Sequence, residues 1–546
     1  MPVTLAINGQ STQADPNLSL FDQAEAMGID VPTSCLKQGK CKECMVEVAE
    51  GMDALSPATE AERHLKGNFR LSCQTFVTAE SGLVRCHTMR RGHMRIEHEA
   101  FGMSERALPL DPAVTRAGES IFIDGVEVDR CSGPKHGLAM DLGTTTVVLR
   151  LFNLETGEPI AVTSFENPQR FGGSEVMSRI AYDTTHPGRL LMRTLCGYLS
   201  HAIEKFPVDP KTIYETVVVG NSTMRDLFFR QSVYSIGQTP YRSITEIEMA
   251  EGKRATTSLT QTGLRSLLPI HPRARVYGAP IVSGHVGADA AACMLAVDLA
   301  HEDRLIAVMD IGTNTELIVG NKDHILAASC PAGPAFEGGA IACGMPALDG
   351  AIEEVAIDGS GEFRVRVIAD GSPQGICGSG LVDLLSELLR TGRMNERGRF
   401  EDGSDRIDVA RGAEGGVYLL ESDVNELAQA KGANVAGLQV VFNTFGIDFD
   451  GIDVFYLAGG FGRHLNVEAS KRIGLVPNLP DEKFVRAGNL AIEGATVALL
   501  SKTKRQELED LVKKVRHCRL ETHPNFFDFF VEGCQFKPVE TIPCAK

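Results

Sequence analysis

At the start of the chain, hydrophobic positions follow three patterns in succession. VTLAIN, from residue 3, alternates as a strand does, LSLFDQAEAMGI has the helical period and ends at Gly28, and CMVEVAEG, from residue 44, alternates again. Cysteines stand between the helix and the second strand. The pattern predicts a small domain in the order strand, helix, cysteine loop and strand.

Two later segments repeat one pattern, in which an apolar strand is followed by D-x-G-T-x-T and a second apolar strand. They are GLAMDLGTTTVVLRLFN, from residue 137, and RLIAVMDIGTNTELIVGN, from residue 304. Each predicts a hairpin whose glycine permits a tight turn and whose backbone amides and hydroxyls can hold phosphate oxygens. One such copy is more often an ordinary hairpin, but two copies in a duplicated unit favour phosphate binding. The predicted phosphate-binding residues are Gly143, Thr144, Thr145 and Thr146, then Gly312, Thr313, Asn314 and Thr315.

Three acidic residues are candidates for the chemistry at these loops. Asp141 and Asp310 end the two strands, where a carboxylate is useful for holding hydrated Mg²⁺. Glu337, in AFEGG, is a candidate for orienting water or Mg²⁺, and a solvated loop carboxylate is the alternative.

A third glycine-rich motif follows a predicted strand in DVFYLAGGFGRHLNVEASKRIGLVP, from residue 453. Gly459, Gly460 and Gly462 would let the backbone approach a purine and a ribose closely, ahead of a helix that opens near Asn466. The P-loop signature G-x-x-x-x-G-K-[ST] does not occur in the sequence, so ATP would have to be bound in another way.

The cysteines indicate a second kind of site. Of 14 cysteines, three form C-x5-C-x2-C and a fourth follows after 28 further residues. Four thiolates at this spacing can surround an iron–sulfur cluster, with Gly39 turning amides toward it and nearby lysines offsetting its charge. A structural zinc site is the alternative, although zinc sites favour two close cysteine pairs. The predicted ligands are Cys35, Cys41, Cys44 and Cys73, and Cys86 is interpreted as an incidental thiol.

Size and charge narrow the class of protein. The 546 residues are 43% hydrophobic and carry a formal net charge of −17, which disfavours general binding to nucleic acid or to anionic membranes. The amino terminus has no basic segment followed by an apolar stretch, and no uninterrupted apolar run of about 18 residues follows. We therefore expect a cytoplasmic protein.

Between the two regions, breakers and scattered charges predict a linker that contains a hairpin around Asp124-Gly125, in SIFIDGVEVD. Near the carboxyl end, RQELEDLVKKVRH is predicted as a charged helix and NFFDFFVEGCQF as a strand-like aromatic segment. The predicted domains are a cluster domain (1–89), a linker (90–136), two ATPase lobes (137–303 and 304–500) and a carboxy-terminal extension packed on the ATPase (501–546).

The motifs resemble two known architectures. The cysteine region is similar to the [2Fe–2S] ferredoxins of β-grasp fold, with a gap between the first two cysteines that is closer to the adrenodoxin type than to the plant type. The two D-x-G-T-x-T loops with LAGGFG at 457–462 resemble the acetate and sugar kinase, Hsc70 and actin superfamily. This resemblance implies two α/β lobes with duplicated ribonuclease-H-like cores that close over ATP and Mg²⁺.

Together, these regions resemble the reductive activators of corrinoid proteins. The resemblance implies ATP-dependent reduction of a corrinoid from Co(II) to Co(I) by one-electron transfer from the cluster, on a partner protein of a methyltransferase system. It also implies an external electron donor, either a flavin reductase or a ferredoxin, and a homodimer. A small-molecule kinase with a redox-sensing domain and a non-catalytic, ATP-switched electron carrier are the alternatives.

Overall fold

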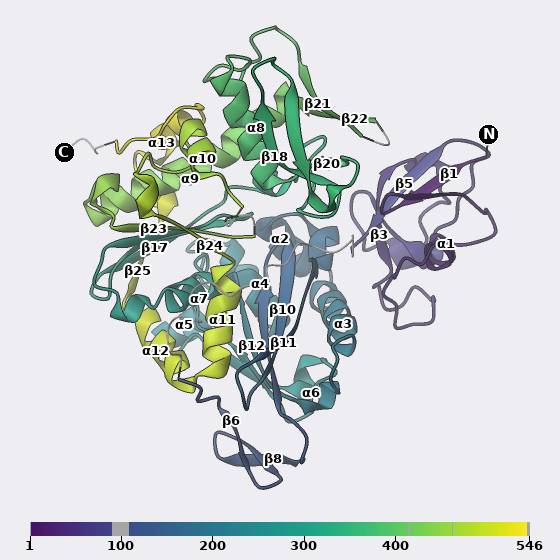
Figure 1. The fold of residues 1–546 in the computed structure, drawn as a ribbon. Coiled ribbons are helices and arrows are strands. Elements are labelled where there is room, and N and C mark those ends of the chain that lie inside the picture. The colour runs from purple at the N-terminus through teal and green to yellow at the C-terminus, as the bar shows by residue number, and fades with distance from the viewer. Residues whose placement is uncertain (1, 90–108, 413–414, 461, 463, 543–546) are drawn as a thin grey trace. The chain divides into compact units, whose positions relative to one another are not determined.

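The computed structural model describes residues 2–89, 109–412, 415–460, 462 and 464–542 (Figure 1). They form two compact units. The first contains the described residues up to 89 and residues 112–278, and the second contains residues 109–111 and the described residues from 279 onward. The domain boundaries expected from the sequence are finer than these units and remain a prediction.

The amino-terminal part of the first unit is a five-stranded sheet with one main helix, α1 (Leu20–Ala26). β1 and β5 are parallel, whereas the other neighbouring strands are antiparallel. Ser19 and Asp22 form a capping box that starts α1, as the polar residues before a helical run favour. The predicted order of strand, helix, loop and strand is confirmed. The strand order is β2 (Gln10–Gln13), β1 (Thr4–Ile7), β5 (Leu83–Thr88), β3 (Met45–Glu50) and β4 (Phe69–Leu71).

The predicted linker hairpin is confirmed as part of a small antiparallel sheet. This sheet consists of β6 (Val114–Ala117), β7 (Ser120–Ile123) and β8 (Val126–Arg130). Asp124 and Gly125 both have positive φ, 48° and 81°, which is the backbone that a two-residue hairpin turn needs. Residues 90–108 of the predicted linker lie outside the described residues.

The first ATPase-like lobe is built on a six-stranded sheet. β9 is antiparallel to β10, β10 is antiparallel to β11, and β12 runs parallel to β9 and β14. Every residue of β9 and β12 is buried, as expected for central strands covered on both faces. The strand order is β11 (Pro159–Glu166), β10 (Thr146–Asn153), β9 (His136–Leu142), β12 (Ile213–Gly220), β14 (Arg275–Gly278) and β13 (Leu259–Thr262). The helices are α2 (Val176–Thr185), α3 (Leu190–Glu204), α4 (Ser222–Phe228), α5 (Ile244–Ala250) and α6 (Gly263–Ser266).

The second unit repeats this topology. Five strands of each sheet share one arrangement, in which the first three form an antiparallel meander and two later strands continue in parallel from the first strand. Each sheet adds one edge strand, which is antiparallel in the first unit and parallel in the second. This is the duplicated α/β core predicted from the repeated motif. The second order is β24 (Phe484–Gly488), β23 (Val454–Ala458), β15 (Ile306–Asp310), β16 (Thr315–Gly320), β17 (Ile325–Cys330) and β25 (Val515–His517). Its helices are α7 (Ala288–Ala296), α8 (Gly378–Arg390), α9 (Glu421–Phe445), α10 (Val467–Ile473), α11 (Leu490–Leu500), α12 (Lys502–Val512) and α13 (Phe526–Gly533).

Two small sheets complete the second unit. One contains β19 (Phe363–Val367), β18 (Ala351–Ile357) and β20 (Gly375–Ile376), and the other pairs β21 (Arg406–Gly412) with β22 (Gly415–Leu420).

The aromatic segment near the carboxyl end is a helix, so its prediction as strand-like was wrong. In α13, the buried residues Phe529 and Gly533 are four positions apart and share one helix face. That face packs on α9, where a Cβ at Gly432 would lie 2.7 Å from Cys534 Sγ. Packing against a neighbouring helix therefore overrode the strand propensity of the phenylalanines. The charged helix predicted before it is confirmed as α12, but the last three residues of that prediction, Val515–His517, form β25 instead.

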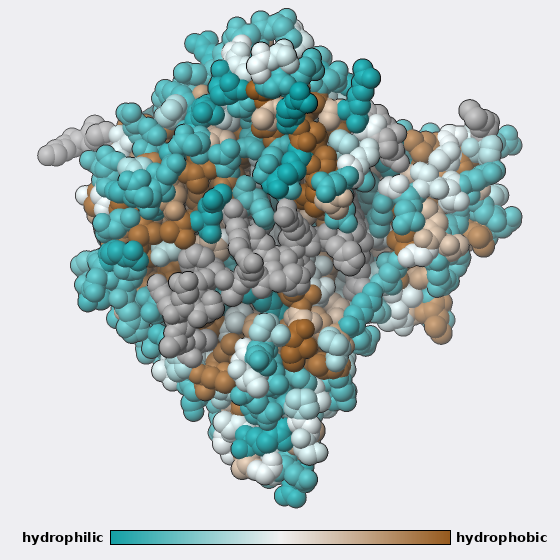
Figure 2. Space-filling view, in the orientation of Figure 1, coloured by the Kyte–Doolittle hydropathy of each residue, from teal (hydrophilic) through white to brown (hydrophobic). Residues whose placement is uncertain are grey.

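Within the described residues, no helix combines the length and the apolar character that crossing a membrane requires. On the face drawn in Figure 2, hydrophilic residues predominate and apolar ones lie in separate patches. Scattered apolar residues of this kind are normal on protein surfaces.

Candidate functional sites

The four predicted cluster ligands come together at one end of the amino-terminal domain. Three belong to the loop between α1 and β3, and Cys73 follows β4. Cys44 donates a hydrogen bond to Cys73, with 3.2 Å between the sulfur atoms. Cys44 and Cys73 are buried, whereas Cys35 and Cys41 are partly exposed. The fold therefore joins ligands that lie far apart in the sequence.

Backbone amides surround these sulfur atoms and favour their thiolate forms. The hydrogen bond from Cys44 lowers the pKa of the Cys73 thiol to about 6, and the Gly39 amide contributes. Burial raises the pKa of Cys35, but amides of its own loop outweigh this effect and lower it overall. The other two thiols have raised pKa values. Burial raises the pKa of Cys41, and the hydrogen bond to Cys73, together with burial, raises that of Cys44.

Four convergent sulfurs with N–H donors directed at them fit an iron–sulfur cluster, since thiolates bind the iron and amides stabilise the negative charge. Cys86 lies apart from them in β5, where burial raises its pKa to about 12. Its interpretation as an incidental thiol agrees with that position.

The lysines of the loop do not act as one group. Lys42 lies close enough to all four cysteines to interact electrostatically with them, and it donates a 2.5 Å hydrogen bond to Ala61 O. Lys37 instead pairs with Asp22, at 2.7 Å, and with Glu25, at 2.9 Å. The carboxylates of α1 therefore pair with the Lys37 ammonium group, and the offsetting of the cluster's charge by the loop lysines stays a prediction.

The first phosphate loop is the hairpin between β9 and β10. A Cβ at Gly143 would lie 2.4 Å from Thr146 O, so the turn requires glycine. Asn167 Nδ2 donates to Gly143 O at 2.8 Å, and the Asn167 amide donates to Thr145 O at 2.7 Å. Asp141 is buried at the end of β9. The loop is thus held rigidly on the lobe with its acidic residue beside it.

Asn221 holds the same loop from a second side. Its Nδ2 donates to Thr144 Oγ1 at 3.0 Å, while its Oδ1 caps the start of α4. Asn221 follows the buried strand β12 directly. Neither asparagine has a local signal that marks this contact.

The second phosphate loop joins β15 to β16. Asp310 ends β15, and Thr313 donates a hydrogen bond to Glu337. A Cβ at Gly312 would lie 3.9 Å from Glu337 Oε1. Glu337 therefore lies at the loop, as the sequence suggested. Asn314 is half-buried, and the buried Thr315 hydroxyl has no hydrogen-bond partner among the described residues.

The third glycine motif meets this loop inside the second unit. Gly459 has a φ of 107°, and a Cβ there would lie 2.2 Å from Ile311 O and 3.1 Å from Asp310 Oδ1. Gly462 is also confined, with a Cβ position 2.6 Å from Ala458 O, whereas no described residue beyond the chain neighbours of Gly460 has an atom within 4 Å of its Cβ position. Asn466 caps α10 where a helix start was predicted.

Two further carboxylates stand near Asp310, and the sequence analysis missed both. Burial, followed by the charges of Asp289 and Asp310, holds the pKa of Glu316 well above its usual range. Cys293 Sγ donates to Asp310 Oδ2 at 3.3 Å. Asp289 lies in the first turn of α7 and Glu316 within β16. Only the fold brings these residues to the second phosphate loop.

Three parts of the chain match known protein families. Residues 3–78 match the 2Fe-2S iron-sulfur cluster binding domain, residues 136–302 the RACo middle region, and residues 304–545 the C-terminal domain of RACo, the ASKHA domain. The first of these matches favours a [2Fe–2S] cluster over zinc at the four cysteines.

Individual proteins agree with these matches. The chain is 31% identical to the corrinoid activation enzyme RamQ of Eubacterium limosum, over 76% of this chain and 72% of that protein. It is 24% identical to the [Co(II) methylated amine-specific corrinoid protein] reductase of Methanosarcina barkeri, over 72% of this chain and 76% of that protein. A solved reductive activator for a corrinoid, iron-sulfur protein matches with a TM-score of 0.71 and 26% identity, over 98% of both chains. The chain therefore belongs to the RACo family of reductive activators of corrinoid proteins, with a ferredoxin-like domain followed by an ASKHA domain.

Proposed function

We propose that this protein reduces the cobalt of a corrinoid protein from Co(II) to Co(I) in an ATP-dependent reaction that supports a methyltransferase system. The observation that carries the proposal is the joining of a four-cysteine ferredoxin domain to two phosphate-loop lobes in one chain of this family. A cluster bound by Cys35, Cys41, Cys44 and Cys73 supplies a one-electron carrier.

The exposed side of the cysteine loop is the proposed point of electron exchange. Cys35 and Cys41 are partly exposed, and Leu36, beside Cys35, is 87% exposed. Cys44 and Cys73 face the protein interior. One electron from an external flavin reductase or ferredoxin enters here and one electron leaves for Co(II), which becomes Co(I).

ATP is proposed to supply the energy for this difficult step. Moving one electron against 100 mV requires about 2.3 kcal/mol. A ligand can transmit energy only by binding two conformations with different affinities, so nucleotide binding and hydrolysis must change how the protein engages its partner.

The phosphate loops are proposed to hold the nucleotide through backbone amides and threonine hydroxyls. Asp141 and Asp310 would hold hydrated Mg²⁺, since hard oxygen ligands suit this ion. Glu337 would orient the attacking water, which adds to the γ-phosphorus as ADP leaves. Gly459, Gly460 and Gly462 would receive the adenosine. Each of these roles is proposed from the position of the residue in its lobe.

We propose a homodimer in the cytoplasm as the working form. All thirteen cysteines in the described part of the chain are free, as a reducing compartment favours.

The test is an anaerobic assay of Co(I) absorbance. Reduced protein is mixed with a Co(II) corrinoid protein of a methyltransferase system, with ATP, without ATP and with a non-hydrolysable analogue. We expect Co(I) only with hydrolysable ATP, and loss of this signal in Cys41→Ala but not in Cys86→Ala.

The absence of Co(I) with several corrinoid partners, together with an intact cluster and measurable ATP turnover, would contradict the proposal. A phosphorylated metabolite formed in step with ADP would instead identify a kinase. Partner binding set by nucleotide without any reduction would identify a switched electron carrier.

A further inference from the structure

Glu43 stands between two cluster ligands and is almost fully buried, although it is charged. Its residue is 6% exposed, and it lies in the sequence between Cys41 and Cys44. Its backbone N–H donates to the Cys41 thiol, and Ser34 Oγ donates to its Oε1 at 2.7 Å. A buried carboxylate is costly unless other groups satisfy it, so its remaining contacts are informative.

Those contacts come from helix α3 of the first ATPase-like lobe. His201 Nε2 lies 3.1 Å from Glu43 Oε2, and Tyr198 donates its hydroxyl to Glu43 O at 2.7 Å. Gly197 lets the helix approach, because a Cβ there would lie 2.6 Å from Glu43 Oε1. Three residues of one helix therefore contact a single residue of the cysteine loop.

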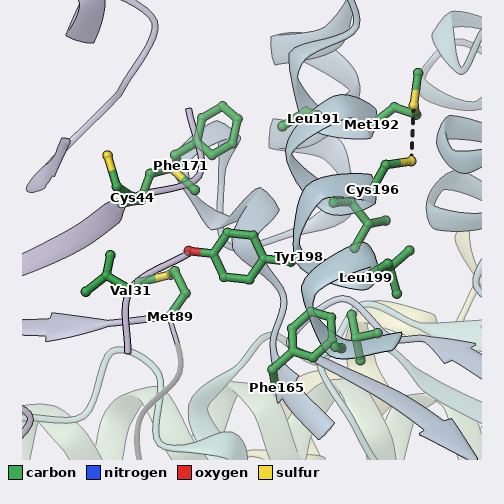
Figure 3. Packing of buried hydrophobic residues seen from close by; sticks show 14 of the residues in the cluster. Val31, Cys44, Met89, Phe165, Phe171, Leu191, Met192, Cys196, Tyr198 and Leu199 are labelled. Atoms are coloured by element: carbon green, nitrogen blue, oxygen red, sulfur yellow. Dashed lines mark hydrogen bonds between the residues drawn. The ribbon is translucent and has the colours of Figure 1, made fainter. Parts of the chain in front are cut away.

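Apolar side chains from both domains surround these polar contacts. In Figure 3, the ring of Tyr198 reaches from α3 toward the segment that carries Cys44, directly before β3, with Met89 and Val31 on the same side as Cys44. These residues belong to one continuous cluster of buried side chains that includes Phe171 and Leu191 of the lobe. Burial of this kind strengthens hydrogen bonds within it.

The same surface is connected to the first phosphate loop. Phe171, in the short 3₁₀ helix Pro168–Gly172, lies 5.7 Å from the ring of His64 in the cluster domain. Asn167, which caps this helix, is the residue that bonds Gly143 and Thr145 of the loop. Helix α3 packs on this 3₁₀ helix. A continuous set of contacts therefore joins the cysteine loop to the phosphate loop.

We propose that Glu43 is a positioning residue that anchors the cysteine loop to α3 and couples the position of the cluster to the state of the first phosphate loop. The coupling rests on the proposed role of residues 141–146 in nucleotide binding, whereas the anchor does not. Glu43 acts through Cys41 and α3 and is not itself a cluster ligand.

An exposed ion pair at the same interface provides the readout. Asp30 and Lys205 form a salt bridge between the two domains, and each side chain is 58% exposed. A carbodiimide can join this carboxylate and amine as an amide, and mass spectrometry measures the yield of the Asp30–Lys205 peptide. The cross-link therefore reports docking without relying on corrinoid reduction.

The anchor is tested on the cluster-loaded, full-length protein without nucleotide. We expect Glu43→Ala and His201→Ala each to lower the cross-link yield by about fivefold or more, since the first removes the side chain that both His201 and Ser34 contact and the second takes one partner from the buried Glu43 carboxyl group. Glu43→Gln keeps an acceptor for Ser34 and should restore part of the yield. The matched control Glu60→Ala removes an exposed carboxylate of the same domain, which pairs with Arg63, and should leave the yield unchanged.

Gly197→Ala provides a second, steric test. Its methyl group should lower the yield when Glu43 is present and have little further effect in the Glu43→Ala background. The visible spectrum of the cluster should be the same in all variants, which separates loss of docking from loss of the cluster. Wild-type yields in both Glu43→Ala and His201→Ala, or additive effects of Glu43→Ala and Gly197→Ala, would overturn the anchor.

The coupling is tested by adding a non-hydrolysable ATP analogue whose binding is followed by fluorescence in the same samples. We expect bound nucleotide to change the yield by about twofold or more in the wild type and not in Glu43→Ala. Bound nucleotide with an unchanged wild-type yield would overturn the coupling. Failure of the analogue to bind would contradict the proposed function instead, and the nucleotide-free yields would still decide the anchor.

Discussion

Gly459 offers the sharpest test of the contact between the third glycine motif and the second phosphate loop. In Gly459→Ala, the new methyl group would lie 2.2 Å from Ile311 O and 3.0 Å from Ile311 C, both backbone atoms. The backbone cannot retreat freely, because the Ile311 amide donates to Ala458 O at 3.0 Å. The new alanine would also keep a φ of 107°, a backbone conformation that residues other than glycine rarely adopt. Both effects act on the second unit alone.

The expected cost follows from these two effects. Overpacking costs about 1–3 kcal/mol and an unfavourable backbone conformation about 1–3 kcal/mol, so the free energy of unfolding should fall by about 2–6 kcal/mol. At about 2–4 °C for each kcal/mol, that loss lowers the melting temperature by at least about 4 °C. Differential scanning calorimetry of the nucleotide-free protein measures it.

Gly460→Ala is the matched control, because its Cβ position has no atom within 4 Å from the described part of the chain beyond its neighbours in sequence. It should melt with the wild type, and weaker ATP binding at an unchanged melting temperature would indicate that Gly460 contacts the nucleotide. The reasoning is refuted if Gly459→Ala melts within about 2 °C of the wild type. It is also refuted if both variants are destabilised equally.

Three other substitutions test the cluster ligands, Glu337 and the buried Lys431 in turn. Cys41→Ala should abolish the visible absorbance of the cluster, while Cys86→Ala, which removes a buried thiol outside the ligand set, should retain it; equal loss would contradict the assignment. Glu337→Gln should slow phosphate release by about 100-fold or more if Glu337 orients water, at similar nucleotide affinity, and an unchanged rate would remove it from the mechanism. Burial lowers the pKa of Lys431 from 10.5 to about 7, so the unfolded chain binds more protons between these pH values. Wild-type stability relative to Lys431→Met, measured by denaturant unfolding, should therefore rise by up to about 4 kcal/mol from pH 7 to pH 10.5, and a flat difference would contradict the burial argument.

Local sequence patterns predicted most of the fold. The alternation in VTLAIN, the helical period after Ser19 and the two D-x-G-T-x-T hairpins each involve residues close in sequence, so backbone geometry alone links them to a structure. The aromatic segment that became α13 shows where this fails, because its helix depends on the surface of α9. The ion pairs of Lys37 were likewise not predicted, because nothing in the cysteine spacing reveals the carboxylates of α1.

The sequence by itself determined the chemistry that this protein can carry, through four thiols at a ferredoxin-like spacing and two glycine–threonine hairpins. Only the tertiary structure decided which residues surround those groups. Glu43 and His201 are 158 positions apart, and Asp289 reaches Glu316 from a separate helix. Such contacts follow from how strands and helices pack, and no period or spacing in the chain encodes them. Ligand motifs are local, whereas the burial and charge that control them are properties of the folded chain.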